Sequence, residues 1–173
     1  GRIGEVGVEN LRCESAYDRS NPKDEAHAWM AVTLEDVRDA WVRQVVVKHF
    51  AGSAVDVLGS ASRVTVEDCQ YLAPVSEIGG QRRNAFLVSG GQVLMQRLYS
   101  ERAFHDFGVG PCAPGPIAFV QCQSSYPYSF SGALDSWASG VLFDVVNIDA
   151  QQLRYANREQ DGQGAGWCAA NSL

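Results

Sequence analysis

The chain has 173 residues and a formal charge of −6, with 46% apolar and 20% charged residues. This length suits one domain, and the composition is too apolar for a disordered chain. The acidic excess argues against a nucleic-acid partner, and no membrane span is expected because Lys48, Asp56 or Asp144 interrupts the longest apolar runs.

A short apolar pattern recurs along the chain. The segments that begin at Val6 and Val64 carry apolar residues at their first, third and sixth positions. The first two alternate as in a half-buried strand, and the sixth follows a bend that returns the chain to the interior. In chain order, the seven copies begin at Val6, Val32, Val45, Val64, Val93, Ile117 and Val141.

The spacing of these copies predicts a parallel β-solenoid. From Val64 onward they follow at intervals of 29, 24 and 24 residues. A period in the twenties, with Gly, Ser, Asn and Asp between β-branched strands, suits coils stacked about 4.8 Å apart. The copies at Val32 and Val45 are too close for a full coil, so we expect one to occupy a second face of the same turn. Residues 40–43 would form the corner, with Trp41 packed.

Both ends of the chain influence the predicted domain organisation. The chain enters a strand by Val6, and residues 166–173 are similar to the start of another coil. An uncovered coil exposes unpaired backbone groups. We therefore predict a single β-helix domain over residues 1–173, truncated at both ends and open to self-association there. The alternative is that short loops cap the ends.

Longer motifs occur from about Ala26 onward. They are Pro74-Val75-Ser76, Gly79-Gly80-Gln81-Arg82-Arg83, Phe86, Gly91-Gln92, His105-Asp106-Phe107, Gly115-Pro116-Ile117-Ala118-Phe119-Val120-Gln121-Cys122, Trp137-Ala138-Ser139-Gly140-Val141-Leu142-Phe143-Asp144 and Gly166-Trp167-Cys168-Ala169-Ala170-Asn171. Together they resemble bacterial secreted proteins of the pectate-lyase-like superfamily. The resemblance implies an all-β, right-handed, single-stranded parallel β-helix, here with about six to seven coils. It also implies a polysaccharide partner and a secreted, periplasmic or cell-surface location.

Signatures of the better-known branches of that superfamily are missing from the sequence. It has neither the paired aspartates and Gly-His-Gly of polygalacturonases nor a carboxylate run similar to the pectate-lyase calcium site. No metal site or cofactor is therefore expected, and calcium dependence stays open. Residues 131–137 also depart from related proteins, in which His and Arg precede the Trp.

Two pairs of residues are the candidates for catalysis. Arg82 and Arg83 follow a glycine-rich bend, where their guanidinium groups could grip a sugar carboxylate or sulfate. The resemblance adds that an Arg can act as the base. His105 is the candidate acid or base, with Asp106 orienting it in a segment that we interpret as a turn. The alternatives are an Arg paired with Glu77 or Asp68, and a structural His beside a turn-capping Asp.

The candidates for substrate binding are aromatic or basic. Tyr126, Tyr128 and Trp137 lie in a loop-like stretch, where exposed rings could stack on pyranoses or instead fold onto the solenoid. Lys48 and His49, at a strand end, are weaker candidates because such residues are usually solvated or packed.

The cysteines are not expected to act as nucleophiles. Cys69 and Cys122 share the sixth position of the pattern, which predicts burial in one stack, and Cys112 is the thiol expected to be exposed or paired.

Two functions remain open at this stage. The first is a lyase or glycoside hydrolase that acts on an anionic glycan along a surface groove. The second is a carbohydrate-binding or scaffold module without turnover. An enzyme should place Arg82, Arg83, His105 and Asp106 around one groove, whereas a scaffold should scatter them.

Overall fold

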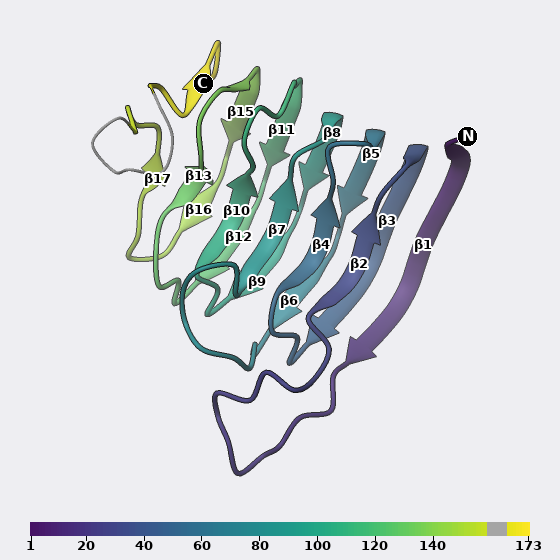
Figure 1. The fold of residues 1–173 in the computed structure, drawn as a ribbon, viewed down its shortest axis with the longest axis vertical. Helices are drawn as coiled ribbons and strands as arrows, with labels where there is room; N and C mark the ends of the chain where they lie inside the picture. Colours follow the sequence, from purple (N-terminus) through teal and green to yellow (C-terminus); the bar gives the residue numbers. More distant parts are fainter. Residues whose placement is uncertain (159–165) are drawn as a thin grey trace.

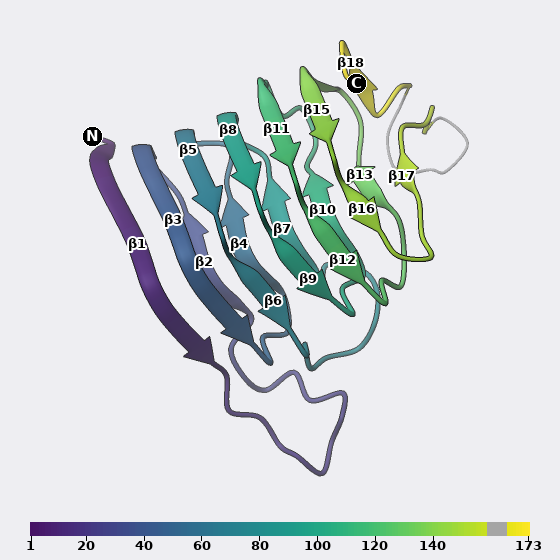
Figure 2. The same cartoon turned by 180° about the vertical axis from the view of Figure 1, so that it is seen from behind.

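The computed structural model describes residues 1–158 and 166–173. Every regular element in these residues is a β-strand. Figures 1 and 2 show the strands stacked side by side, with β1 (Ile3–Glu14) at one end and the C-terminal strands at the other. The described residues contain no helix with the length and apolar character that a membrane span requires.

The larger sheet is built from strands that recur along the chain. Its order is β15-β11-β8-β5-β3-β6-β9-β12-β16, and β1 pairs with β3. The strands of one arm are β3 (Val37–Lys48), β5 (Ser62–Glu67), β8 (Gly91–Gln96), β11 (Ile117–Val120) and β15 (Val141–Asp144). Those of the other arm are β6 (Gln70–Leu72), β9 (Tyr99–Glu101), β12 (Gln123–Ser125) and β16 (Asn147–Ile148). Because β3 is long, it pairs with β5 in its first half and with β6 in its second half.

A second sheet alternates with the first along the chain. Its order is β17-β13-β10-β7-β4-β2. The strands are β2 (Met30–Leu34), β4 (Ser53–Val57), β7 (Asn84–Val88), β10 (His105–Val109), β13 (Ser131–Ala133) and β17 (Leu153–Arg154). A small third sheet pairs β14 (Ala138–Ser139) with β18 (Ala169–Ala170). Pairings between these named strands are parallel, and the chain returns repeatedly to each sheet, an arrangement compatible with a parallel β-solenoid.

The strand register confirms most of the predicted repeat. Val64 pairs with Val93, Val93 with Ile117, and Ile117 with Val141. Between residues 30 and 50, however, the prediction is wrong in detail. The residue that pairs with both Val6 and Val64 is Ala40.

Ala40, rather than Val32 or Val45, therefore begins the copy in this part of the chain. Val32 lies on the second sheet, in β2, which agrees with a second face for one of the two close copies. Val45 occupies the sixth position of the Ala40 copy, opposite Leu11. Residues 40–43 are mid-strand in β3 and not a corner, and Trp41 is half-buried with its indole N–H donating to Glu9 at 3.2 Å.

The bend before each sixth position has a specific backbone cause. The residue that precedes it has a positive φ of 51–56° in every copy that stacks in this sheet. This left-handed conformation turns the chain between the two arms. The residues are Asn10, Gln44, Asp68, Arg97, Gln121 and Val145.

The core consists of side chains stacked from one turn of chain to the next. Val66, Met95 and Phe119 are fully buried, and the rings of Phe86 and Phe107 stack with centroids 6.2 Å apart. Cys69 and Cys122 are buried as predicted, and burial raises the pKa of each thiol to about 11. Cys112 is exposed, also as predicted, and all five thiols are free.

Candidate functional site

Two cavities lie beside the strands and loops that carry most of the candidate residues. We name each after one buried basic side chain in its wall. The His105 cavity has a volume of about 610 Å³, and the Arg83 cavity has a volume of about 450 Å³.

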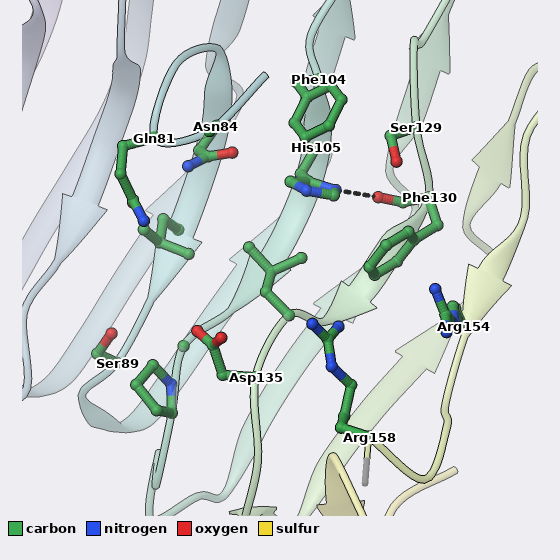
Figure 3. A pocket seen from close by; sticks show the side chains of 15 residues that line it. Gln81, Asn84, Ser89, Phe104, His105, Ser129, Phe130, Asp135, Arg154 and Arg158 are labelled. Atoms are coloured by element: carbon green, nitrogen blue, oxygen red, sulfur yellow. Dashed lines mark hydrogen bonds between the residues drawn. The ribbon is translucent and has the colours of Figure 1, made fainter. Parts of the chain in front are cut away.

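His105 is the first residue of β10 and is only 8% exposed (Figure 3). Its Nδ1 lies 2.6 Å from the carbonyl oxygen of Phe130, which can only accept, so Nδ1 carries the proton. Burial lowers the pKa of His105 from 6.5, which favours the neutral ring. Nε2 therefore keeps its lone pair and can accept a hydrogen bond or a proton.

Asp106 does not orient His105. The segment is a strand rather than the turn that we interpreted from the sequence, and neighbouring side chains in a strand point to different sides. Asp106 is fully buried, and its Oδ1 accepts a hydrogen bond from the Ser100 hydroxyl at 2.6 Å. Burial raises the pKa of Asp106 to about 6. Asp106 is therefore a core residue. The carbonyl of Phe130, rather than Asp106, orients the His105 ring.

The other polar groups of the His105 cavity come from three segments. Asn84 pairs with His105 across β7 and β10 and is 4% exposed. Its Oδ1 has no hydrogen-bond partner among the described residues. Asp135 lies on the loop after β13, and Arg154 holds its guanidinium carbon 5.0 Å from the centroid of the Phe130 ring. Figure 3 shows these side chains around one hollow.

Arg83 immediately precedes β7 and is 7% exposed. Its Nε donates to the Ser76 hydroxyl at 3.1 Å, and its Nη2 donates to the Ser76 carbonyl at 2.6 Å. The guanidinium also lies 5.8 Å from the centroid of the Tyr128 ring. Both of these hydrogen bonds go to uncharged groups, so Arg83 is a buried cation without a carboxylate partner in the described part of the chain.

Around Arg83, the cavity wall is basic and aromatic. Arg19, Lys23 and Arg102 line it, as do Tyr17 and Tyr128. No Asp or Glu is among the described residues that line it. Lys23 has a salt bridge to Glu77 at 3.0 Å, whereas Arg19 and Arg102 are exposed. An acidic protein thus concentrates four cationic side chains at one hollow.

His49 is a further wall residue of the Arg83 cavity. Its ring lies edge-on to Tyr17 with centroids 5.0 Å apart, and its Nδ1 is 3.7 Å from Glu14. Burial and the charge of Lys48 lower the pKa of His49, and Glu14 acts in the opposite direction. His49 is therefore mainly neutral near pH 7.

Arg82 does not line the Arg83 cavity, and its side chain has different partners from that of Arg83. Its guanidinium forms a two-pronged ion pair with Glu25 and lies 5.7 Å from the centroid of the Trp29 ring. It therefore fastens residues 15–29 to the loop before β7. The partner is Glu25, not Glu77 or Asp68 as weighed from the sequence.

The remaining candidates lie outside the two cavity walls. Lys48 ends β3, opposite Leu72. Tyr126 and Trp137 are 67% and 62% exposed and both have a positive φ. Of the substrate-binding candidates, the structure thus brings only His49 and Tyr128 together, and it adds Arg83 to them.

Sequence reasoning missed several wall residues. These residues lie in unrelated local contexts, and no spacing in the sequence links them. They are Arg19, Arg102, Asn84 and Asp135. In the described ranges 1–158 and 166–173, no group of three His, Cys, Asp or Glu side chains is placed to hold a metal ion.

Comparison with known proteins leaves the family open. No protein-family model matches the chain, and searches of curated proteins and of solved structures gave no match. Function is therefore inferred from the two cavities.

Proposed function

We propose that this chain is a carbohydrate-binding β-solenoid module that recognises an anionic glycan. The observation that carries the proposal is the Arg83 cavity, with four cationic side chains and no carboxylate among its described wall residues. In this proposal the fold is a right-handed, single-stranded parallel β-helix of the pectate-lyase-like kind, with about six to seven coils, in a secreted, periplasmic or cell-surface protein.

The electrostatics of Arg83 favour an anionic ligand. A buried charge is costly unless an opposite charge or several hydrogen bonds compensate it. The Ser76 groups satisfy two of the guanidinium N–H donors. A sugar carboxylate or sulfate would supply the missing negative charge, and Arg19 and Arg102 at the wall would add charge-assisted hydrogen bonds.

The aromatic side chains suit a sugar ring. Tyr17 and Tyr128 are part of the wall, and Tyr128 is 46% exposed. A tyrosine offers an apolar face for the C–H side of a pyranose while its hydroxyl stays in water. Charge and ring contacts together therefore favour an acidic sugar over an inorganic anion.

The distribution of the proposed catalytic residues favours binding over turnover. Asp106 is in the core, Arg82 is paired with Glu25, and Arg83 and His105 line different cavities. They do not surround one groove, which is the arrangement that an enzyme acting through these four residues would need.

One observation keeps a lyase or glycoside hydrolase as a second candidate. The neutral His105 presents an unprotonated Nε2 in a cavity that also contains Asp135, so a base and a carboxylate are available there. Turnover would appear as unsaturated product absorbing near 235 nm or as new reducing ends. Loss of that product in His105→Ala would establish the enzyme.

The binding proposal is tested by calorimetry with polygalacturonate and chondroitin sulfate. Because hydrogen bonds to charged groups contribute about 1.5–3 kcal/mol, Arg19→Gln and Arg102→Gln should each weaken binding about tenfold or more. Arg38→Gln, an exposed arginine outside both cavities, is the matched control and should bind as the parent does. Parent-like affinity in the Arg19→Gln/Arg102→Gln double variant, or no binding of either glycan, would overturn the proposal.

A further inference from the structure

The His105 cavity differs from the Arg83 cavity in its chemistry. Asn84 and His105 are register partners on β7 and β10, so their side chains lie about one strand spacing apart, roughly 4.8 Å. Both are more than nine-tenths buried. Oδ1 of Asn84 has no hydrogen-bond partner among the described residues, and the hydrogen bond from Nδ1 of His105 to Phe130 leaves its Nε2 as an acceptor. Figure 3 shows both side chains at the same part of the hollow, and Asp135 across from them.

Apolar groups form much of the remaining wall. The rings of Phe104 and Phe130 flank His105, with centroids 4.4 and 4.7 Å from its own. Leu87 and Leu134 cover Gly108, on which a Cβ would lie 3.0–3.1 Å from their methyl groups. These contacts hold the imidazole in place and give the hollow an apolar surface beside its acceptors.

The charges of the His105 cavity have both signs. The charge of Asp135 raises the pKa of His105, and the charge of Arg158 lowers it. The Arg154 guanidinium lies over the Phe130 ring. The Arg83 cavity, in contrast, has only cationic charged residues in its described wall. Unpaired acceptors, apolar walls and mixed charge suit a ligand with hydroxyl donors, an apolar ring face and no net charge, such as a neutral pyranose.

Three chain segments contribute to both cavities. Residues 78–84, 102–105 and 128–130 each place some side chains in the Arg83 cavity and others in the His105 cavity. Tyr128 and Phe130, for example, are two residues apart and line different hollows. The two cavities are therefore neighbours along these three segments, and a chain-like ligand that follows the segments would meet both.

We infer that the two cavities are adjacent subsites, the Arg83 cavity for an acidic sugar and the His105 cavity for an uncharged one. The preferred ligand is then a heteropolysaccharide in which acidic and neutral residues are neighbours, rather than a homopolymer of uronic acid. This inference rests on the proposed function, because it takes the glycan in the Arg83 cavity as given.

The test compares two glycans that share the same acidic sugar. Hyaluronan alternates glucuronate with an uncharged N-acetylglucosamine, and glucuronan contains glucuronate alone. The intact chain should bind hyaluronan at least tenfold more tightly than glucuronan in calorimetry. Equal affinity for the two, or tighter binding of glucuronan, would overturn the inference.

Two variants test whether the preference for hyaluronan arises in the His105 cavity. His105→Asn keeps a side-chain N–H near the Phe130 carbonyl but removes the Nε2 acceptor, and it should abolish the preference without changing glucuronan affinity. Arg102→Gln should weaken both glycans equally. If His105→Asn melts below the parent, Asp135→Asn gives the same test from the loop.

The two proposals fail in distinguishable ways. If polygalacturonate, chondroitin sulfate, hyaluronan and glucuronan all fail to bind, the proposed function fails. If polygalacturonate or chondroitin sulfate binds but hyaluronan and glucuronan do not, only the subsite inference fails. If both bind and the preference survives in His105→Asn and in Asp135→Asn, only the second subsite fails.

Discussion

The buried Asp106 carboxyl should make the stability of this protein depend on pH. The side chain is fully buried, and its Oδ2 has no hydrogen-bond partner among the described residues. Burial raises the pKa of Asp106 from 3.8 to about 6, although the hydroxyls of Ser100 and Ser124 act in the opposite direction. The native state therefore binds a proton more tightly than the unfolded state does.

The sign of the effect follows from this difference. Well below pH 3.8, the ordinary pKa of an Asp, both states are protonated at Asp106, and above about pH 6 the native state must hold a carboxylate in its core. The contribution of Asp106 is thus most favourable at low pH and is lost as the pH rises from about 4 to 6. A shift of about two pKa units corresponds to about 3 kcal/mol in the free energy of unfolding.

Replacement of Asp106 by Asn removes the charge and keeps the shape. Asp106→Asn should raise the free energy of unfolding at pH 7.5 by up to about 3 kcal/mol, and this gain should vanish near pH 4. The assay is urea unfolding followed by tryptophan fluorescence between pH 4 and 7.5, with the variant compared with the parent at each pH. The exposed Asp144→Asn is the control. A gain independent of pH, or no gain at pH 7.5, would refute the reasoning.

Three further predictions concern the fold and the thiols. Val66→Asp places a charge at a fully buried position between Val42 and Met95, so the cooperative urea transition should be lost at pH 7.5; a parent-like midpoint would show that the repeat assignment is wrong. Gly132→Ala should cost about 2 kcal/mol or more in urea unfolding, because φ is +134° and the new Cβ would lie 2.3 Å from the Arg154 carbonyl oxygen; unchanged stability would contradict this contact. In the native protein Cys112→Ser should remove the fastest reaction with a disulfide reagent, whereas Cys69→Ser should not, because Cys112 is exposed and Cys69 is buried.

The repeat could be predicted because it is local. Strand alternation and the bend before the sixth position are properties of a few consecutive residues, and Val64, Val93, Ile117 and Val141 display them clearly. The copy at Ala40 escaped because alanine is a weak apolar signal beside the valines at residues 45–47. Those valines lie in the second half of β3, and only the pairing with β1 and β5 fixes its register.

The candidate residues could be named from the sequence, but not grouped. His49, Arg83 and Tyr128 are 34 or more residues apart in the chain, yet they line one cavity because successive turns of chain place their loops beside each other. Arg19 and Arg102 gave no local signal at all.

His105 and Asp106 show the opposite case. They are neighbours in sequence, but in β10 one side chain lines a cavity and the other enters the core. The sequence by itself determined the residue types and the repeat, because these depend on local alternation. Only the tertiary structure decided which side chains share a cavity, because that depends on how strands separated by about 24 residues stack and which loops they bring together.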